Sequence, residues 1–215
     1  MLHSVVNFFR DMYRHPISTL AWTIVTLVAG CAKQPTTEAP RSASTVQVIA
    51  SDWLPLEDNS VLDFETSVEG TQEKGRLVMQ VRRMHDNLVE LNVAGKVRRL
   101  EVKAEGVAIA TGGWLLKSPF TVGSSFPGLS GRVVVVSVDR TVNVPAGHFT
   151  QCIETEESTA TAITRTDFCR GVGIARLVVE GQMNGQPRRE TAELRFHGPR
   201  IDLGPEKTVA SPAGQ

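Results

Sequence analysis

Short runs of alternating apolar and polar residues are the feature that most restricts the fold of this chain of 215 residues. In residues 61–68 (VLDFETSV), Leu62 and Phe64 would lie on one side of an extended segment. Asp63 and Glu65 would lie on the other side. Successive side chains point to opposite faces of a β-strand, whereas a helical face needs a period of 3.6 residues. The alternation therefore predicts strands that bury one face.

Comparable runs recur along the chain with glycines and polar turns between them. They are RLVMQVRR (76–83), NLVELNV (87–93), KVRRLEVK (96–103), GVAIAT (106–111), RVVVVSVDRTVNV (132–144), HFTQCIETEE (148–157), TATAITRTDFC (159–169), GIARLVVE (173–180) and RRETAELRF (188–196). Short strands at this spacing are typical of an antiparallel meander. We predict an all-β fold, a single curved sheet of about nine or ten strands. It forms either an open barrel or a two-layer sandwich, with no long helix inside the domain.

Two turns are identifiable from their residues. Val144-Pro145-Ala146-Gly147 has proline at the second position and glycine at the fourth, as in a type I turn. Met183-Asn184-Gly185-Gln186 contains Asn-Gly, the strongest short hairpin signal. Each turn predicts that the strands on either side of it pair with one another.

The first thirty residues have the layout of a secretory signal. Arg10 and Arg14 outweigh Asp11 in the first sixteen residues, and residues 17–30 form a run without a charge. This run is shorter than the roughly 20 residues of a transmembrane helix. A basic region followed by an apolar region and small residues predicts a signal peptide over residues 1–30. An N-terminal anchor that is never cleaved is the alternative.

The end of this run, Val28-Ala29-Gly30-Cys31, resembles the lipobox of bacterial lipoproteins. The resemblance implies that Cys31 becomes the first residue of the mature chain, carrying a diacylglyceryl group and an N-acyl chain such as palmitate. More than one acyl chain is needed for stable anchoring. In Gram-negative relatives a residue other than aspartate after the cysteine, here Ala32, goes with transfer to the outer membrane. The implied location is the cell envelope.

The rest of the chain divides by composition. Residues 31–50 are rich in Pro, Thr, Ser and Ala and predict a flexible tether, residues 51–203 the β-domain, and residues 204–215 a disordered tail. Removing two Arg and one Asp with the signal leaves 21 basic and 22 acidic residues, a net charge of −1. Such a balance argues against nucleic-acid binding, which depends on Lys and Arg neutralising phosphates.

Three further pieces carry a second resemblance: WLPL (53–56), VPAGHFTQC (144–152) and CRGVGI (169–174). In this order they resemble a loose group of uncharacterised exported bacterial β-domains, many of them lipoproteins. Arg170 departs from the group, in which proline is usual at that position. The resemblance implies an exported β-domain and no chemistry.

Cys152 and Cys169 are the only cysteines left once Cys31 is lipidated. They lie on successive predicted strands joined near residues 158–160, and an even number in an exported chain suits a disulfide. The alternative is a metal site, because His148 precedes Cys152 by four residues. A zinc site needs three or four ligands, and no other His or Cys clusters nearby. We therefore expect a disulfide, no metal and no cofactor.

Three arginines fall on the same side as the apolar residues of their strands: Arg83, Arg98 and Arg188. At the mouth of an apolar concavity they would suit an anionic amphiphile. However, Arg83 ends one strand and Arg98 begins the next but one, so a meander would place them at opposite ends. The alternative is an exposed face on which such arginines pair across strands with Glu90, Glu101 or Glu193.

No catalytic arrangement stands out in the sequence. A hydrolase needs a nucleophile, a base and an orienting group, and the histidines of the domain fall in predicted turns or at a strand end. Trp53 and Trp114 are the only candidates for a carbohydrate-stacking platform. We expect a lipid-anchored, non-catalytic module that binds a partner protein or an apolar ligand. The alternatives are an open-barrel carrier of an amphiphile and an unrecognised enzyme.

Overall fold

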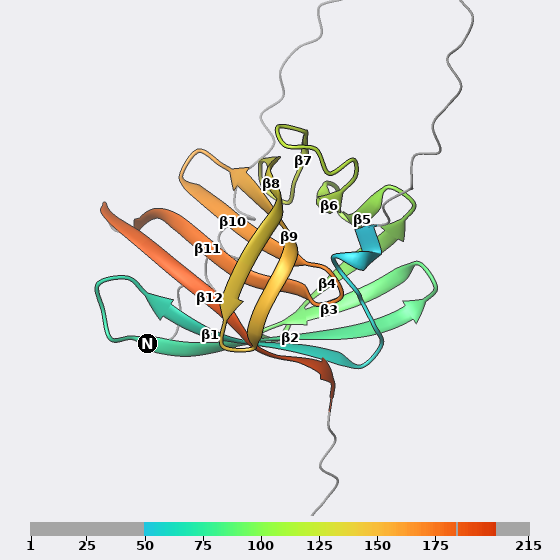
Figure 1. Ribbon diagram of the computed structural model, residues 1–215, viewed down its shortest axis with the longest axis horizontal. Coiled ribbons are helices and arrows are strands. Elements are labelled where there is room, and N and C mark those ends of the chain that lie inside the picture. The colour runs from blue at the N-terminus through green and yellow to red at the C-terminus, as the bar shows by residue number, and fades with distance from the viewer. Residues whose placement is uncertain (1–49, 184, 201–215) are drawn as a thin grey trace, which may run out of the picture. The chain divides into compact units, whose positions relative to one another are not determined.

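The computed structural model describes residues 50–183 and 185–200, which form one antiparallel β-sheet preceded by a short 3-10 turn, η1 (Ala50–Asp52) (Figure 1). The strands are β1 (Ser60–Val68), β2 (Lys74–His85), β3 (Leu88–Val93), β4 (Lys96–Lys103), β5 (Gly106–Ile109), β6 (Trp114–Lys117), β7 (Ser125–Pro127), β8 (Arg132–Val144), β9 (Gly147–Ser158), β10 (Ala162–Cys169), β11 (Gly173–Met183) and β12 (Gln186–Pro199). The all-β prediction is confirmed. The predicted signal peptide, the tail and all of the tether except Ala50 lie outside the described residues.

The sheet has twelve strands, so the expected nine or ten was wrong. The two missed strands are β6 and β7, of four and three residues. Such short segments cannot display a period of two, and β7 lies in a stretch rich in Pro, Gly and Ser that reads as a loop. The other ten strands were identified correctly. Nine of them have six or more residues and span several alternations, whereas the four-residue β5 was recognised from the turns on either side of it.

The strand order is β6-β5-β4-β3-β2-β1-β12-β11-β10-β9-β8-β7. Every neighbouring pair is consecutive in the chain except β1 and β12, so two meanders join where the first and last strands pair. The two edge strands, β6 and β7, are themselves consecutive. The sheet is therefore an up-and-down barrel left open between β6 and β7, and the barrel-like alternative of the prediction applies.

The backbones near the two edges come very close together. A methyl group added at Gly113, just before β6, would lie 1.9 Å from the carbonyl oxygen of Gly128, just after β7. Trp114 of β6 also packs on a core cluster that contains Phe126 of β7 and Val135 of β8. The sheet thus rolls until its edges nearly meet, although no backbone ladder joins them.

One face of the sheet carries most of the apolar core. Phe64 of β1 lies between Leu194 of β12 and Leu77 of β2 in register, and all three side chains are at most 2% exposed. Phe168 of β10 and Ile153 of β9 continue the same face. Burial of these alternate residues confirms the period-two pattern. Each large buried side chain stabilises the folded state by about 1.5–3 kcal/mol.

The outer half of the β8–β9 hairpin forms an arm, residues 140–150, that folds over the opposite face of β10–β12. The arm ends in the predicted Val144–Gly147 turn, where the amide of Ala146 donates to the carbonyl of Leu194 at 2.8 Å. Gln151 at the base of the arm has a φ of 55° beside a register shift, which marks a β-bulge. This bend lets β8 contact β11 and β12 in addition to the neighbours with which it pairs.

The segment before β1 closes one end of the domain. Leu54 and Leu56 are each 4% exposed, and the indole of Trp53 donates to the carbonyl of Gln151 at 2.8 Å. Ala50, assigned to the tether by the sequence, is buried in η1. The WLPL motif is thus a packing element.

Candidate functional site

Charged side chains occupy the face of β9–β12 opposite the apolar core. In register, Glu154 of β9 pairs with Asp167 of β10, Asp167 with Arg176 of β11, and Arg176 with Glu193 of β12. Side chains directly opposite one another in antiparallel strands lie close enough to interact. The row therefore crosses four strands as a chain of acid and arginine, which we call the inner row.

A second row lies further along the same strands, two residues on in β9 and β10 and four residues on in β11 and β12. Glu156 of β9 pairs with Arg165 of β10, and their side chains lie 3.0 Å apart. Arg165 also lies 3.0 Å from Glu180 of β11, which in turn lies 3.2 Å from Arg189 of β12. This outer row of ion pairs is half-exposed, so each contact contributes little to stability on its own.

The inner row is buried by the arm. Arg140 reaches from β8 across the face and forms ion pairs with Glu154 and Asp167. Arg176 donates from Nε to Asp167 Oδ2 at 2.9 Å. Asp167 and Glu154 are 4% and 8% exposed, among the most buried charged groups that the structure describes. Buried carboxylates need such partners, because an unpaired charge away from water is very costly.

Burial raises the pKa of Asp167 above its ordinary value, although the charges of Arg176 and Arg140 and the hydrogen bond from Arg176 oppose the shift. The nearby carboxylate of Glu154 raises it further. Asp167 Oδ1 is buried without a hydrogen bond within the described residues and lies 3.4 Å from Arg140 Nε. Desolvation therefore dominates at this carboxyl group.

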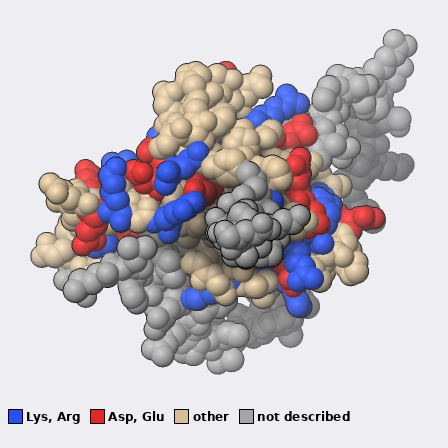
Figure 2. Space-filling model, turned by 90° about the horizontal axis from the view of Figure 1, so that it is seen from below, with Lys and Arg blue, Asp and Glu red and all other residues tan. Residues whose placement is uncertain are grey.

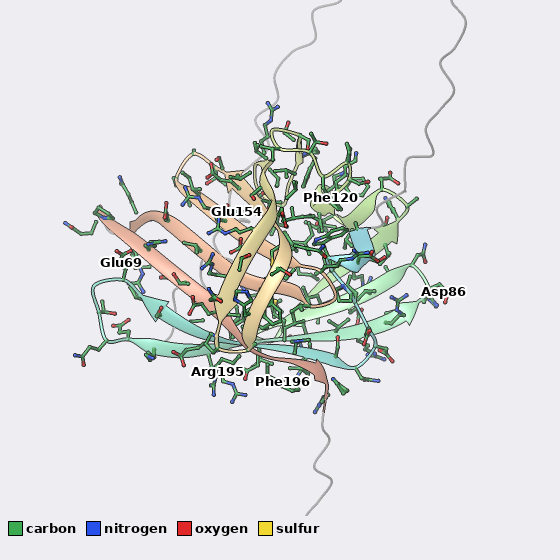
Figure 3. The ribbon with its side chains drawn as sticks, in the orientation of Figure 1. Glu69, Asp86, Phe120, Glu154, Arg195 and Phe196 are labelled. Carbon is green, nitrogen blue, oxygen red and sulfur yellow. A yellow bond between two sulfur atoms is a disulfide. The ribbon has the colours of Figure 1, made fainter. Side chains whose placement is uncertain are left out.

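The two rows and the arm enclose a pocket of about 360 Å³. Its lining residues are Arg140, Glu154, Arg165, Asp167, Arg176, Val178, Arg189, Thr191 and Glu193. Only Val178 is apolar. Figure 3 shows Glu154 beside the β8–β9 hairpin. Figure 2 shows basic and acidic side chains interspersed on the side seen from below. We call this cavity the charged pocket.

The charged pocket offers fixed donors and acceptors of both signs. A guanidinium has five N–H donors, so the two contacts of Arg165 leave donors for a further group. Ion pairing holds the side chains in place, which lowers the cost of ordering them on binding. In the part of the chain that the structure describes, no three His, Cys, Asp or Glu residues are placed to hold a metal ion.

Sequence reasoning missed this pocket. The signal was present in Arg165 and Asp167 of TRTD, which alternate with threonine, and in Glu154 and Glu156 of ETEE. Charges at a period of two on successive predicted strands fall on one face and pair across it. Arg140 could not have been found in this way, because its place depends on the bend of the arm.

Cys152 and Cys169 form a disulfide with an S–S distance of 2.05 Å, as the sequence predicted. Both side chains are fully buried, and Val142 of the arm and Ala175 of β11 pack against them. The bond lies next to the inner row, since Glu154 and Asp167 are two residues away on the same face. His148, which with Cys152 suggested a metal site in the sequence, instead contacts the side chain of Asn143 through Nδ1.

The three arginines proposed for an amphiphile do not gather at one mouth. Arg83 donates to the carbonyls of Asp86 at 2.6 Å and Leu56 at 3.1 Å, which ties the segment before β1 to the β2–β3 turn. Arg188 shares the apolar face of β12 and donates from Nε to buried Glu190. Their positions near opposite ends of the sheet follow from the register of β1 with β2 and β12.

The expected separation of Arg83 and Arg98 was too large. Arg83 pairs in register with Val89 of β3, and Arg98 with Leu91 of the same strand. Arg83 and Arg98 therefore lie opposite positions of β3 that are only two residues apart, and not at opposite ends of the strands. The expected cross-strand alternative is present nearby, where Arg99 lies 3.3 Å from Glu90.

Cys31, the predicted lipidation site, lies outside the described residues. Within residues 50–183 and 185–200, no helix has the length and apolar character needed to cross a membrane.

Comparisons with known proteins give remote matches only. No family model matches the sequence, and no curated protein matches it significantly. A Bacteroides fragilis protein named as exported, with a YmcC-like fold, has a TM-score of 0.42 and 13% identity over 66% of this chain and 96% of that chain. A Parabacteroides distasonis protein named as a lipoprotein has a TM-score of 0.42 and 10% identity over 68% of this chain and 98% of that chain. These similarities are too remote to assign a family or a function.

Proposed function

We propose that this chain is a non-catalytic binding module of the bacterial cell envelope, anchored by lipid at Cys31. Its β-domain recognises a partner protein through the charged pocket. The resemblance of residues 28–31 to a lipobox supports the anchor, and Ala32 supports the outer membrane in a Gram-negative host. The buried disulfide suits an oxidising compartment.

The observation that carries the binding role is the pairing of the pocket carboxylates. Asp167 and Glu154 are both held by Arg140, and Asp167 also by Arg176. A general base needs lone pairs directed at a substrate proton, whereas Asp167 Oδ2 accepts from Arg176 and both carboxylates are ion-paired with Arg140. The same contacts fix the arginines as donors for a carboxylate or a main-chain carbonyl of a partner. An amphiphile carrier would need an apolar cavity, whereas the charged pocket has one apolar lining residue.

The anchor is tested by fractionation. Replacing Cys31 by Ser removes the atom that would be acylated, so we expect release from membranes or accumulation of the unprocessed precursor. Processing and membrane retention that remain unchanged in Cys31→Ser would contradict the anchor.

The pocket is tested by photocrosslinking in intact cells. A benzoylphenylalanine at Thr191 lies in the charged pocket, and one at Val97, 54% exposed on β4, provides the control. We expect a defined protein adduct from position 191 only. The adduct should disappear in Arg165→Ala and persist in Arg99→Ala, which breaks an exposed pair outside the pocket. Adducts of equal yield from positions 191 and 97 would contradict the proposal.

A further inference from the structure

An aromatic surface lies where the chain enters the domain. Trp53 follows the first described residue, Ala50, by three positions, and its ring centroid lies 5.2 Å from that of Phe120. Trp53, Phe120 and Trp114 all pack against the same core cluster of β7–β9 and remain partly exposed. We call these three residues, together with Val122, the entry surface.

The loop between β6 and β7 carries Val122, two residues after Phe120. The amide of Gly123 donates to the carbonyl of Val135 at 2.8 Å, and the amide of Val135 donates to the carbonyl of Ser124 at 2.9 Å. Val122 itself is 60% exposed, the most exposed large apolar side chain that the structure describes. Two backbone hydrogen bonds thus present an apolar side chain to solvent.

Basic side chains lie over both tryptophan rings. Lys117 and Lys103 place Nζ 4.5 and 5.7 Å from the centroid of Trp114, and the guanidinium of Arg170 lies 5.4 Å from that of Trp53. Acidic residues accompany them. Arg170 pairs with Asp52 at 3.0 Å and Lys103 with Glu101 at 2.9 Å, and Glu105 lies in the adjoining β4–β5 turn.

Tryptophan with lysine or arginine is the composition that proteins present to a membrane–water interface. An indole ring suits this interface because it is apolar and carries one polar N–H. The N–H of Trp53 is already bound to the carbonyl of Gln151, so this residue would offer the lipid its ring. Long basic side chains keep their charge in water while their methylene groups lie along apolar surface. An exposed valine beside these residues adds apolar area that a lipid surface would bury.

We propose that the entry surface docks onto the headgroup region of the phospholipid membrane to which Cys31 is anchored. This inference rests on the proposed anchoring at Cys31. Eighteen residues separate Cys31 from Ala50, and a flexible chain of that length has a reach of about 25 Å. Because the predicted tether joins the domain at Ala50, three residues before Trp53, the entry surface lies where the anchor is attached to the domain.

The charges of the entry surface set its lipid preference. Three basic residues are accompanied by three acidic ones, so the local charge nearly cancels. Polybasic membrane binding depends on anionic lipid, whereas aromatic and apolar docking does not. We therefore expect docking to change little when phosphatidylglycerol is replaced by phosphatidylcholine.

Tryptophan fluorescence gives a direct test. The chain has three tryptophans, of which Trp22 lies in the predicted signal and Trp53 and Trp114 lie in the entry surface. The Trp22→Phe protein, purified from membranes with its lipid, is reconstituted into vesicles of phosphatidylethanolamine and phosphatidylglycerol. Part of the lipid carries bromine near the headgroup end of its acyl chains. We expect a roughly twofold loss of tryptophan emission relative to unbrominated vesicles.

Two controls define the surface. A Phe196→Trp chain that also carries Trp22→Phe, Trp53→Phe and Trp114→Phe reports from the far end of β12, where Figure 3 places Phe196 away from Phe120. Its emission should not be quenched. In the Trp22→Phe chain, Val122→Asp should reduce the quenching, whereas Val97→Asp on exposed β4 should leave it unchanged.

Three results would overturn the proposal. Emission of Trp53 and Trp114 that is unchanged by brominated lipid, in protein that co-sediments with the vesicles, excludes docking and leaves the anchor intact. Equal quenching of the Phe196→Trp chain shows that no particular surface faces the lipid. Protein that fails to co-sediment contradicts the anchor, and the docking proposal fails with it.

Discussion

Arg176 donates to Asp167 across β11 and β10 at 2.9 Å, and the carboxyl group that it holds is only 4% exposed. This pair is the centre of the inner row, because Arg140 approaches the same carboxylate from the arm above it. Burial nonetheless raises the pKa of Asp167, so the two arginines only partly offset the loss of water. The stability of the β8–β12 half therefore depends on this network.

Removing Arg176 should destabilise the domain. In Arg176→Met the carboxyl group of Asp167 keeps its burial and loses its hydrogen-bonded partner, which should lower the free energy of unfolding by roughly 3 kcal/mol. Urea denaturation followed by circular dichroism measures the change. Arg99→Met breaks an exposed pair with Glu90 and should cost less than about 1 kcal/mol. Equal losses in the two variants would show that Asp167 does not depend on Arg176.

The pH dependence of stability should have opposite signs at two carboxyl groups. Burial raises the pKa of Asp167, so the folded state binds a proton more readily than the unfolded state. Relative to Asp167→Asn, the free energy of unfolding should therefore fall as pH rises from the unfolded pKa of about 3.9 through the raised value.

Glu65 gives the opposite case, because a hydrogen bond and the charge of Lys74 lower its pKa. Relative to Glu65→Gln, stability should rise as pH rises from the lowered value to the unfolded pKa of about 4.3. Urea midpoints measured between about pH 3 and pH 7 for both variants and the native chain provide the test. Curves of the same sign would contradict the assignment of burial as the cause at Asp167.

The close approach of the sheet edges should make Gly113 intolerant of a side chain. Gly112 and Gly113 both have positive φ values, of 115° and 82°, so alanine at either position is strained by about 1–2 kcal/mol. Only at Gly113 would the new Cβ also meet the carbonyl oxygen of Gly128, at 1.9 Å. Thermal unfolding should therefore show a larger loss for Gly113→Ala than for Gly112→Ala. Equal losses would mean that the edges are not in contact in solution.

The disulfide should stabilise the domain and resist reduction in the folded state. It joins residues 17 apart, and closing a loop of this size contributes about 3 kcal/mol in the chain-entropy model. The sulfur atoms are fully buried, so we expect dithiothreitol to reach them only in urea. Alkylation and mass spectrometry of protein treated with and without urea measure this. Rapid labelling of Cys152 and Cys169 without urea would contradict the buried position.

Sequence reasoning predicted those parts of the fold that depend on local pattern. The alternation that placed Leu62 and Phe64 on one side, and the Asn-Gly hairpin before β12, are confirmed because they involve neighbouring residues. The cysteine pair was found because the two strands that carry it are joined by a short turn.

The contacts that sequence reasoning missed depend on where the whole sheet places residues that are far apart in the chain. Arg140 reaches Asp167 only because the Gln151 bulge bends the arm over β10, and a positive φ at glutamine has no sequence signature. Arg83 was one of three candidates for ligand binding, yet it holds the carbonyl of Leu56, a contact across 27 residues that alternation does not reveal. Long-range contacts of this kind decide which charges form a site.

Native mass spectrometry of protein extracted from membranes in mild detergent would show whether the charged pocket holds a protein partner. We expect a mature chain beginning at Cys31 that retains a protein partner. The partner should be lost in Arg165→Ala and kept in Arg99→Ala, because Arg165 lines the charged pocket and Arg99 does not. A bound lipid or other amphiphile, retained equally by the native chain and both variants and without a protein partner, would contradict partner binding at the charged pocket and favour an open-barrel carrier.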